Sequence, residues 1–240
     1  MLRRRRREGE DHQPGLRDDI GSPSPSESNG RGSNGASGPW DSADDYPVHE
    51  RIDCGSLLIP VREGFEVQIN VAEEQGTWVA VVQEESGMQL QAFAAPRSGE
   101  LWDEVRNEIA ENIAESGGSC HVVYGKFGAE LAGEVPISAE GPAGPLQAVR
   151  FLGYDGPRWF LRGVISGPAV MDEALATEFN ELFGDVVVVR GDYPAPPREQ
   201  LDIRLPEEAR QAMEEQMMSD QPDWMLADPF TRGPEITETR

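Results

Sequence analysis

The residues of this sequence best suited to bind a ligand are arginines set inside apolar stretches. Arg150 lies in QAVRFLG, Arg158 and Arg162 lie in GPRWFLRGV, and Arg190 lies in VVVVRG. Arg97 ends another apolar run, where a helix is expected to start. A guanidinium group can hold a carboxylate or phosphate with two parallel hydrogen bonds, and a helix start also favours an anion. The pattern therefore indicates a candidate anion-binding site at Arg97, Arg150, Arg158 and Arg162.

The order of residues in the run around Arg162 allows two interpretations. Successive side chains of a strand point to opposite faces, so Arg158, Phe160 and Arg162 are predicted to share one face. That face could hold an anion beside an aromatic ring. The other interpretation, which the sequence favours, is that these arginines pair with the many acidic residues and lay their stems over the sheet.

Motifs of known catalytic chemistry do not accompany the arginines in the sequence. Gly125-Lys126 is followed by Phe127, which rules out a P-loop, and no GxGxxG follows a predicted strand. Ser98 lacks the GxSxG context of a nucleophile elbow and is better interpreted as a helix N-cap. We therefore expect a protein without enzymatic activity and without a cofactor.

Four residues could in principle bind zinc: His49, Cys54, Cys120 and His121. Their spacing matches no zinc module, and the adjacent Cys120 and His121 would point to opposite faces of a strand. We expect no metal site, and we interpret Cys120 as a small buried apolar residue.

The composition restricts the partners and the compartment. The formal net charge of −23 over 240 residues disfavours binding to a phosphate backbone. Arg3–Arg7 could make at most a weak contact with an anionic membrane or nucleic acid, because acidic residues follow at once. Two cysteines do not form a disulfide framework, and no apolar run is long enough to span a bilayer. We expect a cytoplasmic protein, and the sequence disfavours membrane and nucleic-acid partners.

The elements that must position the arginines are predicted within residues 48–206, as a single α+β domain. Helices are expected from Ser98 to Gly117 and over Asp172–Phe183, with Gly117-Gly118 as a left-handed C-cap. The predicted fold is a largely antiparallel sheet of about eight strands with the two main helices packed on one face. The apolar periodicity and turn signals predict strands at Ser56–Pro60, Phe65–Val71, Trp78–Gln83, Met88–Ala94, Ser119–Tyr124, Ala129–Ile137, Leu146–Tyr154, Arg158–Ser166 and Val186–Val189.

Polar tails are predicted on both sides of this domain. Residues 1–47, with the Arg3–Arg7 cluster, and residues 207–240, with a short acidic helix at Glu207–Met218, have few residues that could be buried. The second tail also carries a possible motif for a protein partner, which could equally pack back on its own domain. Its residues are Trp224, Met225, Leu226 and Phe230.

Three blocks of the sequence carry a resemblance to a known family. They are LQAFAAPRSGELWDEVRNEI, VRFLGYDGPRWFLRGVISGPA and LFGDVVVVRGDYPAPPREQLDIRLP, together with the entry GSLLIP. With these blocks the chain resembles, over about residues 50–206, an actinobacterial family known as a domain of unknown function, DUF3710. The resemblance implies a cytosolic protein with a variable charged N-terminal tail, and it supplies no catalytic residue. At the level of the fold, the order of elements also looks like the α+β sandwich of PsbP- and Mog1-type proteins.

Three functional hypotheses follow. The first is a non-enzymatic cytoplasmic binding or adaptor protein whose sheet face or tails engage an unknown protein partner. The second is a small-molecule or anion-binding domain, possibly an enzyme, that uses Arg97, Arg158 and Arg162. The third, least favoured by the charge, is nucleic-acid binding through Arg3–Arg7.

Overall fold

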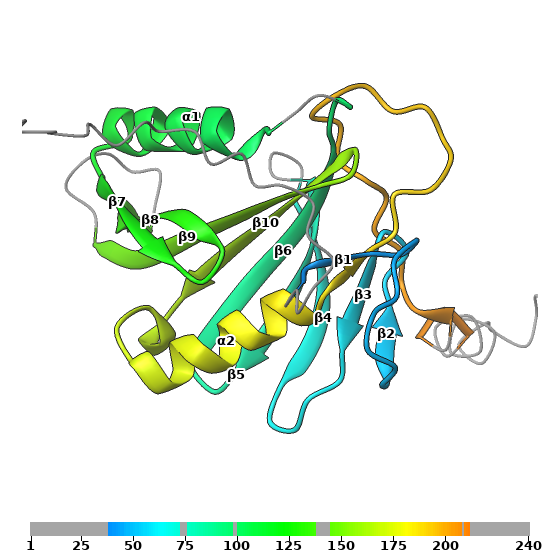
Figure 1. Ribbon diagram of the computed structural model, residues 1–240. Helices are drawn as coiled ribbons and strands as arrows, with labels where there is room; N and C mark the ends of the chain where they lie inside the picture. Colours follow the sequence, from blue (N-terminus) through cyan, green and yellow to red (C-terminus); the bar gives the residue numbers. More distant parts are fainter. Residues whose placement is uncertain (1–37, 73–75, 98–99, 138–144, 208, 212–240) are drawn as a thin grey trace, which may run out of the picture. The chain divides into compact units, whose positions relative to one another are not determined.

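Two β-sheets form the framework of the described residues (Figure 1). The computed structural model describes residues 38–72, 76–97, 100–137, 145–207 and 209–211. The larger sheet has seven strands in the order β4-β5-β6-β10-β9-β8-β7, and every neighbouring pair is antiparallel. These strands are β4 Glu66–Ala72, β5 Gly76–Gln83, β6 Ser86–Ala94, β7 Ser119–Gly125, β8 Gly128–Pro136, β9 Leu146–Gly156 and β10 Trp159–Ser166.

The smaller sheet has four short strands in the order β1-β11-β3-β2. They are β1 Trp40–Asp41, β2 Arg51–Asp53, β3 Leu57–Pro60 and β11 Val187–Val188. The prediction of one sheet of about eight strands is therefore replaced by a sheet of seven and a sheet of four. The α+β class and the mainly antiparallel pairing are confirmed, since among the strands that the structure describes only β1 and β11 pair in parallel.

The folded region begins earlier than the predicted boundary at residue 48. Trp40 pairs with Val187, and its backbone N–H donates to the carbonyl of Val186 at 2.9 Å. The indole Nε1 of Trp159 donates to a carboxylate oxygen of Asp41 at 2.6 Å. A strand of two residues is too short to show a periodicity in the sequence, so the sequence alone places Trp40 and Asp41 in the N-terminal tail.

Helix α2, Glu173–Asp185, packs on one face of the large sheet and closes the main core. Its N-cap is Asp172, whose carboxylate accepts hydrogen bonds from the N–H groups of Ala174 and Leu175 at 2.9 and 3.1 Å. The sheet face beneath the helix is fully buried. The side chains with no exposed surface in this core include Val79, Val81, Met88, Leu90, Leu161, Ile165, Phe179 and Phe183.

Helix α1, Trp102–Glu115, packs on the opposite face, against β7, β8 and β9 (Figure 1). Trp102 stacks on Phe160 with ring centroids 5.8 Å apart. Phe160 and Gly163 point to opposite faces of β10, and Gly163 faces Phe183 of α2. The prediction that both helices share one face is therefore wrong, because the alternating pattern shows that a strand has two faces without showing which helix covers each.

The start of α1 is capped from a distant strand. The N-cap position is Leu101, and the carboxylate of Asp155 in β9 accepts from the N–H groups of Leu101 and Trp102 at 2.9 and 3.2 Å. The predicted cap Ser98 lies outside the described residues. The C-terminal prediction is confirmed, since Gly117 has a φ of 87° and its N–H bonds the carbonyl of Ala114 at 3.2 Å.

Residues 198–204, here called the strap, join the two sheets. The N–H groups of Ala94 and Leu201 link the strap to the end of β6, with bonds of 2.8 Å to Glu199 and 2.9 Å to Ala92. The N–H of Arg204 then bonds the carbonyl of Cys54 at 2.9 Å, beside β3. β5 pairs with β6 only as far as Leu90, so the strap supplies the missing neighbour for the rest of β6.

Candidate functional site

The face of the large sheet that carries α1 is covered only in part. On the opposite face Val79, Leu90 and Leu161 have no exposed surface, whereas Gln68 and Gln89 on this face are exposed. We call the part made by β4, β5, β6 and β10 the open face. Its residues are Gln68, Asn70, Trp78, Ala80, Gln89, Gln91, Arg162 and Val164.

Arg162 stands near the centre of the open face and is held by a chain of amides. Its Nη2 donates to the side-chain oxygen of Gln91, directly opposite on β6. Gln91 Nε2 in turn donates to the carbonyl of Thr77 at 3.2 Å and to Gln200 of the strap at 3.4 Å. The guanidinium carbon also lies 5.4 Å from the ring centroid of Phe93, which is a cation–π distance. The position of this side chain is therefore fixed from three elements.

The charge of Arg162 is not balanced by a carboxylate among the residues that the structure describes. Its hydrogen-bond partner is a neutral amide, and burial lowers the pKa of its guanidinium by desolvation. A cation that has lost water without gaining an anion is an unfavourable arrangement for the isolated domain. A ligand or partner carboxylate would restore the missing interactions.

Arg150 does not belong to this site, although the sequence grouped the two. It points to the face under α2, where its Nη2 donates to Asn180 at 2.5 Å and its Nε lies 3.3 Å from Glu130. Glu130 is almost fully buried, and desolvation raises the pKa of its carboxyl group more than the charge of Arg150 lowers it. Arg150 thus follows the alternative interpretation, an arginine paired with an acid of its own domain.

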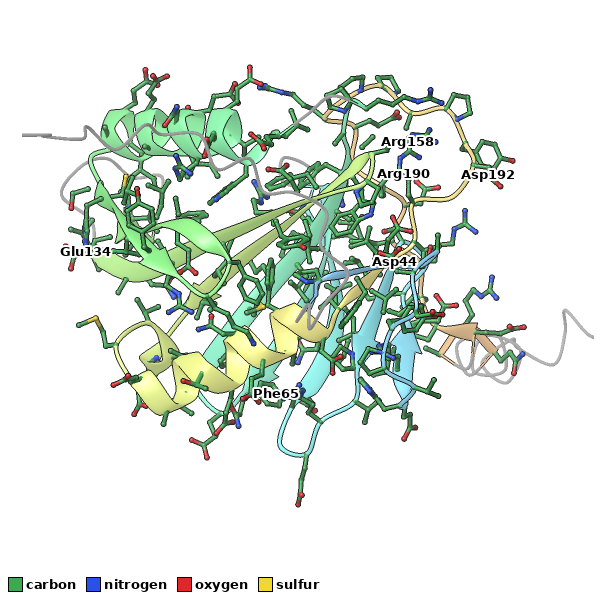
Figure 2. The ribbon with its side chains drawn as sticks, in the orientation of Figure 1. Asp44, Phe65, Glu134, Arg158, Arg190 and Asp192 are labelled. Carbon is green, nitrogen blue, oxygen red and sulfur yellow. The ribbon has the colours of Figure 1, made fainter. Side chains whose placement is uncertain are left out.

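Arg97 and Arg158 lie beside the ends of the central strands β6 and β10, away from the centre of the open face. Arg158 occupies the turn between β9 and β10 instead of the strand, so the prediction that it shares a strand face with Arg162 is wrong. Pro157 before it breaks the ladder and makes the turn. The N–H of Ala95 donates to the carbonyl of Arg158 at 2.9 Å, which brings Arg97 and Arg158 to the same end of these strands. Arg190 also reaches this end, where Figure 2 shows it beside Arg158.

A second polar cluster anchors the N-terminal segment to the end of α2. Asp185 lies 2.8 Å from His49, 3.1 Å from Arg51 and 3.5 Å from Arg62. A carboxylate at a helix C-terminus opposes the helix dipole, and the basic partners offset this. A shallow depression beside it is lined by Asp44, Asp45, Tyr46, Val48, His49, Arg51 and Leu58.

The four residues that could in principle bind zinc are spread over three separate parts of the fold. His49 contacts Asp185, and Cys54 is buried in the main core. Cys120 is half-buried on β7, and the neighbouring His121 on the same strand is exposed. Cys120 is thus less buried than predicted. Within the described ranges, His, Cys, Asp and Glu side chains form no group of three or more that could hold a metal ion.

The predicted partner motif Trp224, Met225, Leu226 and Phe230 lies outside the described residues, as do Arg3–Arg7. Of the open face, the sequence had singled out Arg162 alone; Trp78 and Gln91, and Gln200 of the strap that supports Gln91, were not predicted as site residues. The alternation of β6 did place Gln89 and Gln91 on the face opposite Met88 and Leu90, and this was the available signal. The long-range contact with Gln200 leaves no trace in local periodicity.

Fold and site together define an α+β domain with two sheets, in which one face of the larger sheet is partly uncovered. The chain belongs to the family DUF3710, "Protein of unknown function", whose model matches residues 38–212. The match begins at the first residue that the structure describes. No curated protein and no solved structure matches the chain, so the likeness to PsbP- and Mog1-type proteins stays a prediction. None of the helices described here is long and apolar enough to cross a membrane.

Proposed function

We propose that this protein is a non-enzymatic cytoplasmic binding or adaptor protein that engages a protein partner through its open face. The observation that carries the proposal is the contrast between the two faces of one sheet. One face is sealed by α2, while the other leaves Gln68 and Gln89 exposed around a fixed arginine. A partly apolar sheet face with an aromatic and an arginine has the composition of a protein-binding surface.

Trp78 and Arg162 are the expected energetic centre of the interface. Tryptophan and arginine are enriched among residues that carry most of the binding energy. Arg162 is already held by Gln91 and Phe93, so little side-chain entropy is lost when a partner binds. Because no carboxylate of the described residues pairs with the guanidinium of Arg162, the partner segment is expected to carry an aspartate, a glutamate or a C-terminal carboxylate.

The chemistry of the open face supports binding without catalysis. The polar side chains beside Arg162 in the strand register are the amides of Gln89 and Gln91, which do not exchange protons at neutral pH. Elsewhere, burial and then the charge of Asp53 raise the pKa of the Cys54 thiol to about 11, so it stays protonated and is not a nucleophile. Both cysteines are free, in keeping with a reducing compartment.

The test compares five baits in quantitative affinity purification from cell lysate. They are the full chain, residues 38–240, residues 1–211, Gln89→Glu and Asn107→Glu. The two truncations keep β1 and the strap, which the fold needs. Gln89 and Asn107 are both exposed, so each substitution adds one negative charge, on the open face or on the outer side of α1.

We expect a partner that is recovered by the full chain, by both truncations and by Asn107→Glu. Gln89→Glu should lose it, because the new carboxylate repels the carboxylate that binds Arg162. A partner lost only with residues 212–240 would place the interaction in the tail and refute the role of the open face. Recovery of no specific partner by any bait would count against the adaptor function itself.

A further inference from the structure

The end of β6 gathers arginines from four separate segments. Arg97 follows the strand, and the N–H of Ala95 bonds the carbonyl of Arg158 at 2.9 Å. On the other side, the N–H of Arg198 bonds the carbonyl of Ala94 at 2.7 Å. Arg190, after β11, donates its Nε to the carbonyl of Arg158 at 3.2 Å. This clustering is unexpected in a chain with a net charge of −23.

Only one of the four has its charge balanced by carboxylates nearby. Arg198 lies 2.9 Å from Glu104 and 2.9 Å from Glu108 of α1. Arg97, Arg158 and Arg190 form no ion pair with any residue that the structure describes. Among the described residues, three arginines without an ion pair therefore lie near the end of β6.

Arg190 is held in place by the main chain. Its Nε bonds the carbonyl of Arg158, and its Nη1 bonds the carbonyl of Tyr193 at 3.0 Å. A guanidinium group has five N–H donors, so the unused ones, including those of Nη2, stay free for a ligand. A positioned arginine loses less entropy on binding than a free surface side chain.

Arg158 adopts a backbone conformation that arginine rarely takes. Its φ is 65°, and it is the second residue of the two-residue turn Pro157-Arg158 between β9 and β10. That position is normally occupied by glycine, because a Cβ is strained there. The Arg158 side chain is thus kept at a strained backbone position, and the Arg158 carbonyl holds the second arginine, Arg190, beside it. This arrangement points to a use for the Arg158 side chain.

We propose that Arg97, Arg158 and Arg190 form a binding site for the phosphate group of a small molecule. A phosphate carries about two negative charges at neutral pH and three acceptor oxygens, so it suits a cluster of neighbouring arginines better than a single carboxylate does. The site lies at the end of β6 and does not include Arg162 or the open face. It is therefore independent of the proposed partner binding.

The test is a titration of the full chain with inorganic phosphate, followed by NMR or calorimetry at constant ionic strength. We expect saturable binding that weakens about tenfold or more in Arg158→Gly and in Arg190→Gln. Arg158→Gly relieves the backbone strain, so the variant should fold at least as well as the wild type and separate loss of the site from loss of the fold.

The matched control is Arg204→Gln. Arg204 is exposed, pairs with Asp202 and lies at the far end of the strap beside Cys54. The substitution therefore removes the same charge at a distance from the proposed site. Phosphate binding should be unchanged in Arg204→Gln and in Gln89→Glu. Equal weakening in Arg204→Gln and Arg158→Gly would show an effect of net charge alone and overturn the proposal. Equal affinity for acetate would overturn the assignment to phosphate.

Discussion

Arg150 and Arg162 provide a matched test of the electrostatic argument for the open face. They lie on the neighbouring strands β9 and β10, and both guanidinium groups are largely removed from water. Arg150 contacts the carboxylate of Glu130, whereas Arg162 contacts the amide of Gln91. Replacing each with methionine removes the charge and keeps a long apolar side chain. The two variants then differ mainly in the partner that loses its arginine: the carboxylate of Glu130 or the amide of Gln91.

The expected effects on the free energy of unfolding differ in size. Arg150→Met leaves Glu130, whose side chain is 2% exposed, without its cation, and breaking such a buried pair costs about 3–5 kcal/mol. Arg162→Met loses one charged hydrogen bond, worth about 1.5–3 kcal/mol. It also removes a guanidinium desolvation penalty of several kcal/mol, so we expect a stability within about 1 kcal/mol of the wild type, or above it.

Urea denaturation followed by circular dichroism measures both values, provided that the slopes with denaturant agree with the wild type. Arg162→Met should also lose the protein partner while it remains folded. That combination would mean that Arg162 is kept for binding at no benefit to stability. If both variants were destabilised equally, Arg162 would be an ordinary structural residue and the reasoning about the open face would fail.

Three further predictions test the fold and its pH dependence. Gly153→Ala should destabilise the domain by about 1–3 kcal/mol in denaturation experiments, because its Cβ would lie 2.1 Å from the Trp102 ring; Trp102→Ala should abolish most of this effect, and additive losses would contradict it. Deletion of residues 1–47 removes Trp40 and should lower the melting temperature by several degrees, since each loss of about 1 kcal/mol lowers it by up to about 4 °C. Deletion of residues 1–37 keeps Trp40 and should leave the melting temperature unchanged. Burial raises the pKa of Glu130, so its contribution to stability is present at low pH and is lost as the pH rises through that pKa. The free energy of unfolding of the wild type relative to Glu130→Gln should therefore increase as the pH falls from neutral towards the ordinary pKa of a glutamate, and a decrease would refute the assignment.

Local patterns in the sequence were sufficient for the long elements. The alternation in Met88–Ala94 and the turn residues around Pro157 gave strands within two residues of β6 and β10. The apolar stripe of Asp172–Phe183 gave α2, again within two residues. What local patterns could not give are the short pairings, such as β1 with β11 and the strap with β6, because their stabilising partners are far away in the sequence.

In the candidate site, too, local features could be predicted from the sequence and long-range contacts could not. Strand parity correctly placed Arg162 and Phe160 on one face, which is a local property. It could not show that β10 starts after Arg158, nor that Arg150 meets Glu130 across two strands, because both depend on the register of the sheet. The four arginines of the candidate set therefore divide into one structural ion pair, one residue of the open face and two residues at the end of β6.

This division also bears on why the unpaired arginines are informative. The chain has 44 acidic and only 21 basic residues, so carboxylates are in excess and pairing is the expected state of an arginine. Arg51, Arg62, Arg106, Arg150, Arg198 and Arg204 follow that expectation. Within the residues that the structure describes, Arg162, the exposed Arg210 near the C-terminal end of the described residues, and Arg97, Arg158 and Arg190 do not. Scarcity of acids cannot explain these exceptions, and in two cases the side chain carries a visible cost: desolvation at Arg162 and backbone strain at Arg158. Binding of an external anion would offset the desolvation of the Arg162 guanidinium and the backbone strain at Arg158, and it is these costs, more than the missing ion pairs, that support the two proposed sites.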